Sequence, residues 1–215
     1  MNSSSEKNIA LAQELVGYGA ATVGESGGQN MVARIKPAWI GARLAAPAYP
    51  VQCTPGDNLA IHVGVTRAPA GSVLVVDVGS ERDFGYWGEV LTTAAKKAGL
   101  AGLVIDACVR DAAALAAHGF PVFSTGLALP GASKTKTGTV GAPARVGGVL
   151  VSAGDWLVAD VDGVSVIASD SLVATVAASK TRTENEKNIF SRLNSGETTV
   201  EVLSLDPSVI KVEDA

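Results

Sequence analysis

Short apolar runs in the middle of the chain predict buried strands. Residues 72–78 and 102–106 are nearly continuous in Val, Leu and Ile, and Gly71 and Gly79 bound the first of them. Runs of this length are typical of strands that are covered on both faces of a sheet. We therefore predict two buried strands in this region.

Helical segments alternate with these strands. Residues 88–97 and 111–118 predict helices, the first of them ending before Gly99, and residues 120–123 predict a further short strand. An alternation of strand and helix implies right-handed crossovers, which place the strands parallel to one another. The middle of the chain is thus expected to form a parallel section of sheet.

The segments before and after this region have other patterns. Upstream lie a predicted amphipathic helix, a glycine-rich loop and short strands that prolines interrupt, at residues 6–15, 17–30 and 41–54. Downstream lie several strands without helices between them, and then one or two helices, at residues 138–168 and 171–193. The downstream strands indicate an antiparallel or mixed β layer.

The whole chain, residues 1–215, is predicted to form one domain. Its 215 residues can bury an ample core, and neither an internal repeat nor a linker interrupts them. The core is expected over about residues 15–200. A polar tail precedes it at residues 1–6, and an extended, charged tail at residues 200–215 is expected to wrap around or dock on another surface.

The composition argues against several classes of protein. It is 47% hydrophobic and 18% charged with 24 glycines, as in a compact α/β protein that is rich in turns. A net charge of −4 and the lack of a basic stripe argue against binding to nucleic acid. The chain has no run of 18 apolar residues and its start is polar, so we expect neither a membrane span nor a secretion signal, and a cytoplasmic location by default.

Common catalytic and metal-binding motifs are missing from the sequence. Cys53 and Cys108 make neither a disulfide framework nor a zinc knuckle, and His62 and His118 are too few for a histidine-rich metal site. No phosphate loop, zinc-protease motif or nucleophile elbow occurs. His62 lies on an apolar helix face and is expected to be a core histidine.

The candidate chemistry lies where two predicted helices begin. Arg110 and Asp111 come just after the strand at residues 102–106, and Glu89 lies at the start of the preceding helix. Ligands of open α/β sheets bind beyond the carboxyl ends of the strands, so these side chains are expected to lie together. A hard divalent cation suits one or two carboxylates, and the free N–H groups of a helix start suit an anion. These residues therefore predict a site for one small anion.

Each of these residues also has a simpler interpretation. Asp111 could be only the N-cap of its helix, and Glu89 could be an acid that the helix dipole favours. Arg110 could be one partner of a surface salt bridge. Farther along the chain, Asp160 and Asp162 are expected to serve a β-turn.

The order and spacing of several fragments resemble the RraA-like superfamily. The most specific element is Glu89 followed, after twenty residues, by Arg110-Asp111. The other matching fragments are Asp57-Asn58 with His62, Gly85–Leu91, Ile105–Asp111, Gly119–Phe123, Gly154-Asp155 and Ala159–Val164. The resemblance covers about residues 15–200. Within the superfamily, the chain is most similar to the 4-hydroxy-4-methyl-2-oxoglutarate / 4-carboxy-4-hydroxy-2-oxoadipate aldolases.

This resemblance implies a fold and an activity. The fold is a single-domain α/β/β/α sandwich of the swivelling β/β/α type with a partly parallel sheet, assembled as a homotrimer or a dimer of trimers. The activity is that of a divalent-metal-dependent, class II pyruvate aldolase, a lyase that cleaves 4-hydroxy-2-oxo acids to pyruvate and an oxo acid. Oxaloacetate decarboxylation through the same pyruvate enolate is implied as well.

The resemblance also implies a metal site. Asp111 would bind Mg²⁺ or Mn²⁺ directly, and Glu89 would hold metal-bound water. Glu186 would reach the site of a neighbouring subunit, again through water. A metal at this place would stabilise the negative charge of an enolate.

The same resemblance implies residues that bind the substrate. Arg110 would contact the C2 oxygen of the pyruvyl group and, with Glu89, is implied to be catalytic. Gly88, Val90 and Leu91 would form the substrate-binding turn, where the N–H groups of Val90 and Leu91 face the C1 carboxylate. Binding of a carboxylate at this turn is consistent with the properties of a helix start, because the N–H groups of the first turn are unpaired and the helix dipole favours anions.

The chain also departs from the family pattern. Ala107-Cys108 stands where glycine is usual, and Ala114 stands where an acid is often found. Tyr86-Trp87 and the segment at residues 134–139 differ from the aldolases as well. Two other functions are compatible with the resemblance: a non-catalytic regulator of ribonuclease that acts by protein contact, and a keto-acid decarboxylase whose natural substrate is not an aldol.

Overall fold

The computed structural model describes residues 3–213, with side chains from Glu6 onward. Its centre is a curled, mixed sheet in the order β1-β13-β12-β3-β4-β5-β7-β2, with β9 paired to β3 as well. The strands are β1 (Gln29–Asn30), β2 (Lys36–Pro37), β3 (Leu44–Cys53), β4 (Val73–Asp77), β5 (Gly102–Ile105), β6 (Cys108–Val109), β7 (Val122–Ser124), β8 (Gly126–Leu127), β9 (Gly138–Val140), β10 (Ala144–Val146), β11 (Val149–Val151), β12 (Trp156–Asp160) and β13 (Gly163–Ile167). The helices are α1 (Ser3–Tyr18), α2 (Ala20–Glu25), α3 (Leu59–Arg67), α4 (Glu89–Lys97), α5 (Ala112–His118), α6 (Leu172–Asn194), α7 (Thr199–Val202) and the 3₁₀ helix η1 (Pro207–Val209).

Strand β3 joins the two parts of the sheet. Its residues 44–47 pair antiparallel with β12, and its residues 48–52 pair parallel with β4. The parallel part continues from β4 to β5 and β7, whereas β12, β13 and β1 are antiparallel. The predicted parallel section and the predicted mixed β layer are both confirmed.

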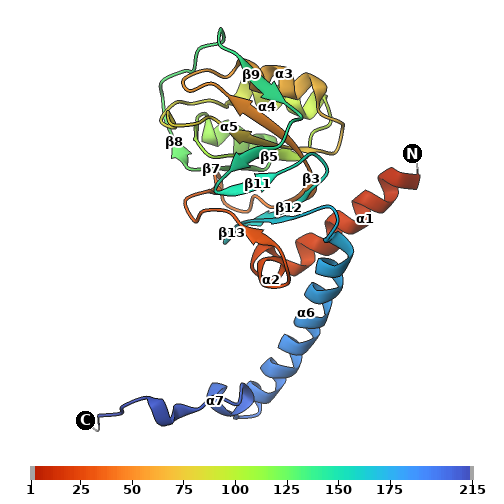
Figure 1. Ribbon diagram of the computed structural model, residues 1–215, viewed down its shortest axis with the longest axis vertical. Helices are drawn as coiled ribbons and strands as arrows, with labels where there is room; N and C mark the ends of the chain where they lie inside the picture. Colours follow the sequence, from red (N-terminus) through yellow and green to blue (C-terminus); the bar gives the residue numbers. More distant parts are fainter. Residues whose placement is uncertain (1–2, 214–215) are drawn as a thin grey trace.

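Helices lie on two sides of this sheet (Figure 1), with α3, α4 and α5 against the parallel part and α1 and α2 against the antiparallel part. Three apolar clusters fill the layers. One lies under α3 to α5, one lies between the two parts of the curled sheet, and one lies under α1 and α2. The expected fold class, an α/β/β/α sandwich with a partly parallel sheet, is confirmed.

Two upstream predictions were wrong. The glycine-rich segment at residues 17–30 contains α2 and β1, because Ala20 and Val23 are buried and Asp160 accepts a hydrogen bond from the N–H of Ala20 at 2.8 Å. The segment at residues 41–54 holds one strand of ten residues, β3, in place of several short strands. Pro47 is the last residue of β3 that pairs with β12, so its missing N–H lies at the end of that ladder.

The two ends of the chain also differ from prediction. Helix α1 begins at Ser3, within the expected polar tail, while residues 1–2 lie outside the described residues. The expected extended tail contains α7 and η1, and its last two residues are likewise outside the described part. Thr198 and Glu201 form a capping box that starts α7, a pattern visible in the sequence. Helix α6 is continuous and leads away from the body (Figure 1).

Candidate functional site

The starts of α4 and α5 lie side by side at the carboxyl end of the parallel strands. The N–H of Glu89 donates to Asp111 Oδ2 at 3.0 Å, across 22 residues of sequence. The N–H of Arg110 donates to the carbonyl oxygen of Trp87 at 2.8 Å. These two bonds connect the turn before α4 to the turn before α5, and they bring Arg110, Asp111 and the first turn of α4 together.

Asp111 has an unusual backbone conformation. Its φ is 60°, in the left-handed region, which a residue with a Cβ rarely adopts. It occupies the N-cap position of α5, yet its side chain makes no capping hydrogen bond to that helix. The interpretation of Asp111 as an ordinary N-cap is therefore wrong, and strained residues of this kind concentrate at functional sites.

Arg110 is not committed to a structural salt bridge. Its Nε lies 3.9 Å from Asp111 Oδ2, and both side chains are nearly half exposed. In the part of the chain that the structure describes, the guanidinium donates no hydrogen bond. A pair this long and exposed contributes little stability, so the guanidinium remains available to a ligand.

Two glycines allow these groups to approach. A Cβ on Gly88 would lie inside the contact distance of Asp111 Oδ2 and 3.1 Å from Arg110 Cγ. A Cβ on Gly85 would lie 2.9 Å from Arg110 Cδ and 2.7 Å from the carbonyl oxygen of Ala128. Gly88 has φ −159°, which any residue adopts, so at this position the lack of a side chain matters for space and not for backbone freedom.

A cavity of about 140 Å³ opens at this place. It is lined by Asn58, His62, Gly85, Tyr86, Gly88, Val90, Leu91, Arg110, Asp111 and Lys134. A second hollow of about 370 Å³ also borders Arg110 and Asp111, and its other lining residues are Leu127, Ala128 and Leu129. The smaller cavity is lined by two cationic side chains, Arg110 and Lys134, and by one carboxylate, Asp111. Its net charge is therefore positive, which suits an anionic ligand.

Asn58, His62 and Lys134 were not predicted as site residues. His62 was expected in the core, but it lines the cavity and is only half buried. Burial lowers the pKa of His62, the positive charge of Lys134 lowers it further, and Asp57 opposes both. The imidazole is thus neutral at neutral pH. The spacing of Asn58 and His62, one helical turn apart, was the signal in the sequence.

The Glu89 carboxylate is directed elsewhere. It is 57% exposed, its Oε1 lies 3.2 Å from His118 Nε2, and it is absent from the lining of either hollow. What Glu89 contributes to the geometry of the site is its backbone N–H. Glu186 lies on α6, where its Oε1 is 3.1 Å from Arg182 Nε, and α6 leads away from α4 and α5 (Figure 1).

The donor set at the site fits a cation that keeps most of its water. Among residues 3–213, no group of three or more His, Cys, Asp or Glu side chains is placed to hold a metal. Asp111 offers one carboxylate, and the cavity that it borders leaves room beside it. Mg²⁺ is commonly bound by one or two carboxylates together with water, so these residues fit it.

Asp57 holds the loop that carries Lys134. Its buried carboxylate accepts hydrogen bonds from the hydroxyl of Ser133 and from the N–H groups of Thr135, Lys136 and Leu59. Burial by itself would raise the pKa of Asp57, but these donors outweigh it and hold the pKa well below the ordinary value. Asp57 therefore joins the loop to the start of α3.

Replacing Asp57 by alanine is expected to destabilise the protein by about 1–3 kcal/mol at pH 7, because several donors lose their acceptor. Since the folded pKa is lowered, this stability is present above the unfolded pKa of about 3.9 and is lost as the pH falls below it. Urea denaturation at pH 7 and at pH 3, below the unfolded pKa, measures the difference. Asp206→Ala, which removes an exposed acceptor of the Ser208 N–H, is the control and should change little. Equal stability of Asp57→Ala and wild type would contradict the role of Asp57.

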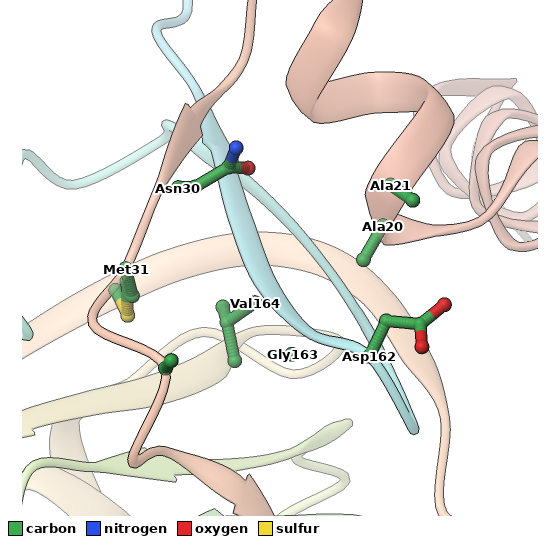
Figure 2. Close-up of a pocket in the computed structure, with 8 residues that line it drawn as sticks. Ala20, Ala21, Asn30, Met31, Asp162, Gly163 and Val164 are labelled. Carbon is green, nitrogen blue, oxygen red and sulfur yellow. The ribbon is translucent and has the colours of Figure 1, made fainter. Parts of the chain in front are cut away.

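A separate cavity of about 280 Å³ lies between α2 and β13 (Figure 2). In Figure 2 the carboxylate of Asp162 points away from Met31 and Val164, which leaves mostly apolar groups there. The N–H of Asp162 donates to Asp160 Oδ1 at 3.0 Å, as the predicted turn requires. This cavity offers no convergent charged groups, and no catalytic chemistry is assigned to it.

A profile of the RraA-like family, described as Aldolase/RraA, matches residues 20–166. The chain belongs to the RraA-like family. The match covers the strands and helices that build the site, and it confirms the resemblance found in the sequence.

No helix within the described residues has the length and apolar character to span a membrane.

Individual relatives agree with this assignment. A protein of Halalkalibacterium halodurans named "Putative 4-hydroxy-4-methyl-2-oxoglutarate aldolase" is 36% identical over 138 residues, which span 64% of this chain and 66% of the relative. An uncharacterized protein from Pseudomonas syringae has a similar structure, with a TM-score of 0.74 and 25% identity over 86% of this chain and 89% of that one. RraAS2 of Streptomyces coelicolor, described as an unusual member of the RNase ES inhibitor RraA family, has a TM-score of 0.72 and 25% identity over 85% of this chain and 96% of its own.

Proposed function

We propose that this RraA-like protein is a lyase, a divalent-metal-dependent class II pyruvate aldolase that also decarboxylates oxaloacetate. One observation carries the proposal: Arg110, Asp111 and the first turn of α4 border a single small cavity. The name of the Halalkalibacterium relative supports the same chemistry.

The start of α4 would bind the substrate's C1 carboxylate. The N–H groups of Val90 and Leu91 lie in the first turn, where no carbonyl of the helix can accept from them. The N–H of Glu89 is already used by Asp111, so these two remain for a ligand. Aligned N–H groups and the helix dipole together favour an anion at this position.

Arg110 would act on the C2 oxygen. Retro-aldol cleavage and β-decarboxylation both leave an electron pair that delocalises onto this oxygen as an enolate. A guanidinium beside the oxygen stabilises that charge more in the transition state than in the ground state. Because the two reactions share the enolate, one arrangement of Arg110 serves both.

Asp111 would hold Mg²⁺ or Mn²⁺, with Glu186 acting through water. Glu89 would also act through water, and for this its carboxylate would have to turn from His118 toward the cavity. When bound, the metal would supply further stabilisation of negative charge at the enolate. The turn conformation of Asp111 and its bond from the Glu89 N–H fix the carboxylate at the mouth of the cavity. Within one chain Glu186 lies on a helix that leads away, so its part in the site would require a neighbouring copy in a homotrimer or dimer of trimers.

The alternative is a regulator of ribonuclease that acts by protein contact. The description of the Streptomyces relative as an RNase inhibitor family member raises this possibility. In this chain the exposed apolar residues of the C-terminal segment, Leu205, Ile210 and Val212, could make such a contact. A regulator does not need a guanidinium and a carboxylate at a shared cavity, and for that reason we prefer the enzyme.

The proposed function is tested by incubating the protein with oxaloacetate and Mg²⁺ and coupling pyruvate release to lactate dehydrogenase. We expect turnover that EDTA abolishes and that added Mg²⁺ or Mn²⁺ restores, because one carboxylate and water bind the metal reversibly. The blank is oxaloacetate with Mg²⁺ alone, which decarboxylates slowly without enzyme. Turnover that persists in EDTA would remove the metal from the proposal, and no turnover on any 4-hydroxy-2-oxo acid or oxaloacetate would favour the regulator.

A further inference from the structure

Two neighbouring side chains of the cavity have no role in the chemistry described above. Asn58 occupies the N-cap position of α3, and His62 follows one turn later. The backbone N–H of His62 donates to the backbone carbonyl oxygen of Asn58 at 3.3 Å. Residues four apart on a helix lie on the same face, and both side chains line the cavity that Arg110 and Asp111 border.

The hydrogen bonds of Asn58 fix the direction of its amide. Its Nδ2 donates to the carbonyl oxygen of Tyr86 at 2.8 Å, so the nitrogen and oxygen of the side chain cannot be exchanged without losing this bond. The remaining atom, Oδ1, is buried and accepts no hydrogen bond from any described residue. Asn58 itself is only 5% exposed, so its oxygen is a fixed acceptor that lacks a donor.

The His62 side chain also has a polar atom without a hydrogen-bond partner among the described residues. Its Nε2 is buried and has no hydrogen-bond partner anywhere in residues 3–213. Most buried polar atoms in proteins are paired, and an unpaired acceptor and ring nitrogen on one helix turn at one cavity are exceptions that need an explanation. Because both residues line the cavity, a polar group bound there is a candidate partner for both atoms.

A hydroxyl group satisfies these two atoms. It can donate its hydrogen to Asn58 Oδ1 and, at the same oxygen, accept from His62 Nε2–H. A carboxylate fits less well, because it only accepts and would face the Asn58 oxygen without a hydrogen between them. The lowered pKa of His62 keeps the ring neutral, which also favours a neutral hydroxyl over an anion at this place.

We propose that Asn58 and His62 form a hydroxyl-binding subsite that recognises the C4 hydroxyl of a 4-hydroxy-2-oxo acid. The inference deepens the proposed function and rests on it. With the C1 carboxylate at α4 and the C2 oxygen at Arg110, the C4 hydroxyl is only two carbons farther along the substrate, within the same small cavity. Oxaloacetate has a carboxylate and no hydroxyl at this position, so the subsite selects aldol substrates.

The subsite is tested by comparing His62→Phe with His62→Gln. Phenylalanine keeps the ring shape without nitrogen, whereas glutamine can place an amide near the position of Nε2. For each variant, kcat/KM is measured for cleavage of 4-hydroxy-2-oxoglutarate and for decarboxylation of oxaloacetate. In His62→Phe we expect the ratio of kcat/KM for cleavage to kcat/KM for decarboxylation to fall on the order of tenfold or more, because a buried donor to the hydroxyl is lost. In His62→Gln we expect this ratio to return to near the wild-type value.

A ratio that stays the same in His62→Phe, or falls equally in both variants, would overturn the subsite. Thermal denaturation of each variant reports whether the fold is retained. A second measurement does not depend on turnover: calorimetric titration in EDTA with 4-hydroxy-2-oxoglutarate and with 2-oxoglutarate, which differ only in the hydroxyl.

Wild type should bind the hydroxylated acid on the order of tenfold more tightly, and His62→Phe should lose this preference. Equal affinity of wild type for the two acids would also overturn the subsite. If wild type shows the binding preference but turns over neither substrate, the proposed function fails and hydroxyl recognition stands.

Discussion

Replacing Arg110 by alanine is expected to lower kcat/KM for oxaloacetate decarboxylation on the order of 10²–10³-fold, the usual effect of removing one donor to an oxyanion. The guanidinium makes no hydrogen bond within the described residues, so its removal should leave the free energy of unfolding nearly unchanged. The coupled pyruvate assay measures the first quantity, and urea denaturation measures the second.

The matched control for this variant is Arg145→Ala. The Arg145 side chain is exposed on β10 and donates to the carbonyl oxygen of Gly148 at 2.8 Å, away from the site. It should retain wild-type activity. An Arg110→Ala protein with more than a third of wild-type activity would show that the enolate charge is stabilised by other groups.

Replacing Gly88 by alanine should lower the same kcat/KM on the order of 10²-fold, although the change adds a single methyl group. The added Cβ cannot coexist with the present position of Asp111 Oδ2 and comes within 3.1 Å of Arg110 Cγ, so both side chains must move. A displacement of about 1 Å at a reacting centre is enough for a loss of this size. The backbone of Gly88 is extended, so strain in φ does not contribute.

Gly17→Ala is the matched control for Gly88→Ala. Gly17 lies in α1, and a Cβ there would meet nothing within 4 Å. This variant should keep full activity and should be as stable as wild type or slightly more stable, because alanine favours a helix. Full activity of Gly88→Ala, measured in the coupled assay, would contradict the close approach on which the site depends.

Local patterns were sufficient for most of the middle of the fold. The apolar runs predicted β4 and β5 closely, and the helix starts of α4 and α5 were placed within one residue. Buried parallel strands have a strong signal, because both faces must be apolar. The glycine-rich segment around α2 was misjudged because its helix depends on burial of Ala20 and Val23 against β13, and not on local preference.

The candidate site was predictable only in part. Arg110 and Asp111 were singled out because they follow a strand and start a helix, and the structure brings them to the first turn of α4. The Glu89 side chain could not be placed from the sequence, since His118, 29 residues away, determines where it points. Lys134 was not recognised because its loop is held at the cavity by bonds to residues far away in the sequence, among them those to Asp57.

The sequence by itself determined the alternation of strands and helices, the family, and the order of the charged residues at the helix starts. It did so because hydrophobic period and helix-start chemistry are properties of neighbouring residues. The tertiary structure decided which backbone N–H donates a hydrogen bond to the Asp111 carboxylate, and which side chains line the same cavity. Those choices depend on how loops far apart in the chain pack at one edge of a sheet, and no local pattern encodes that packing.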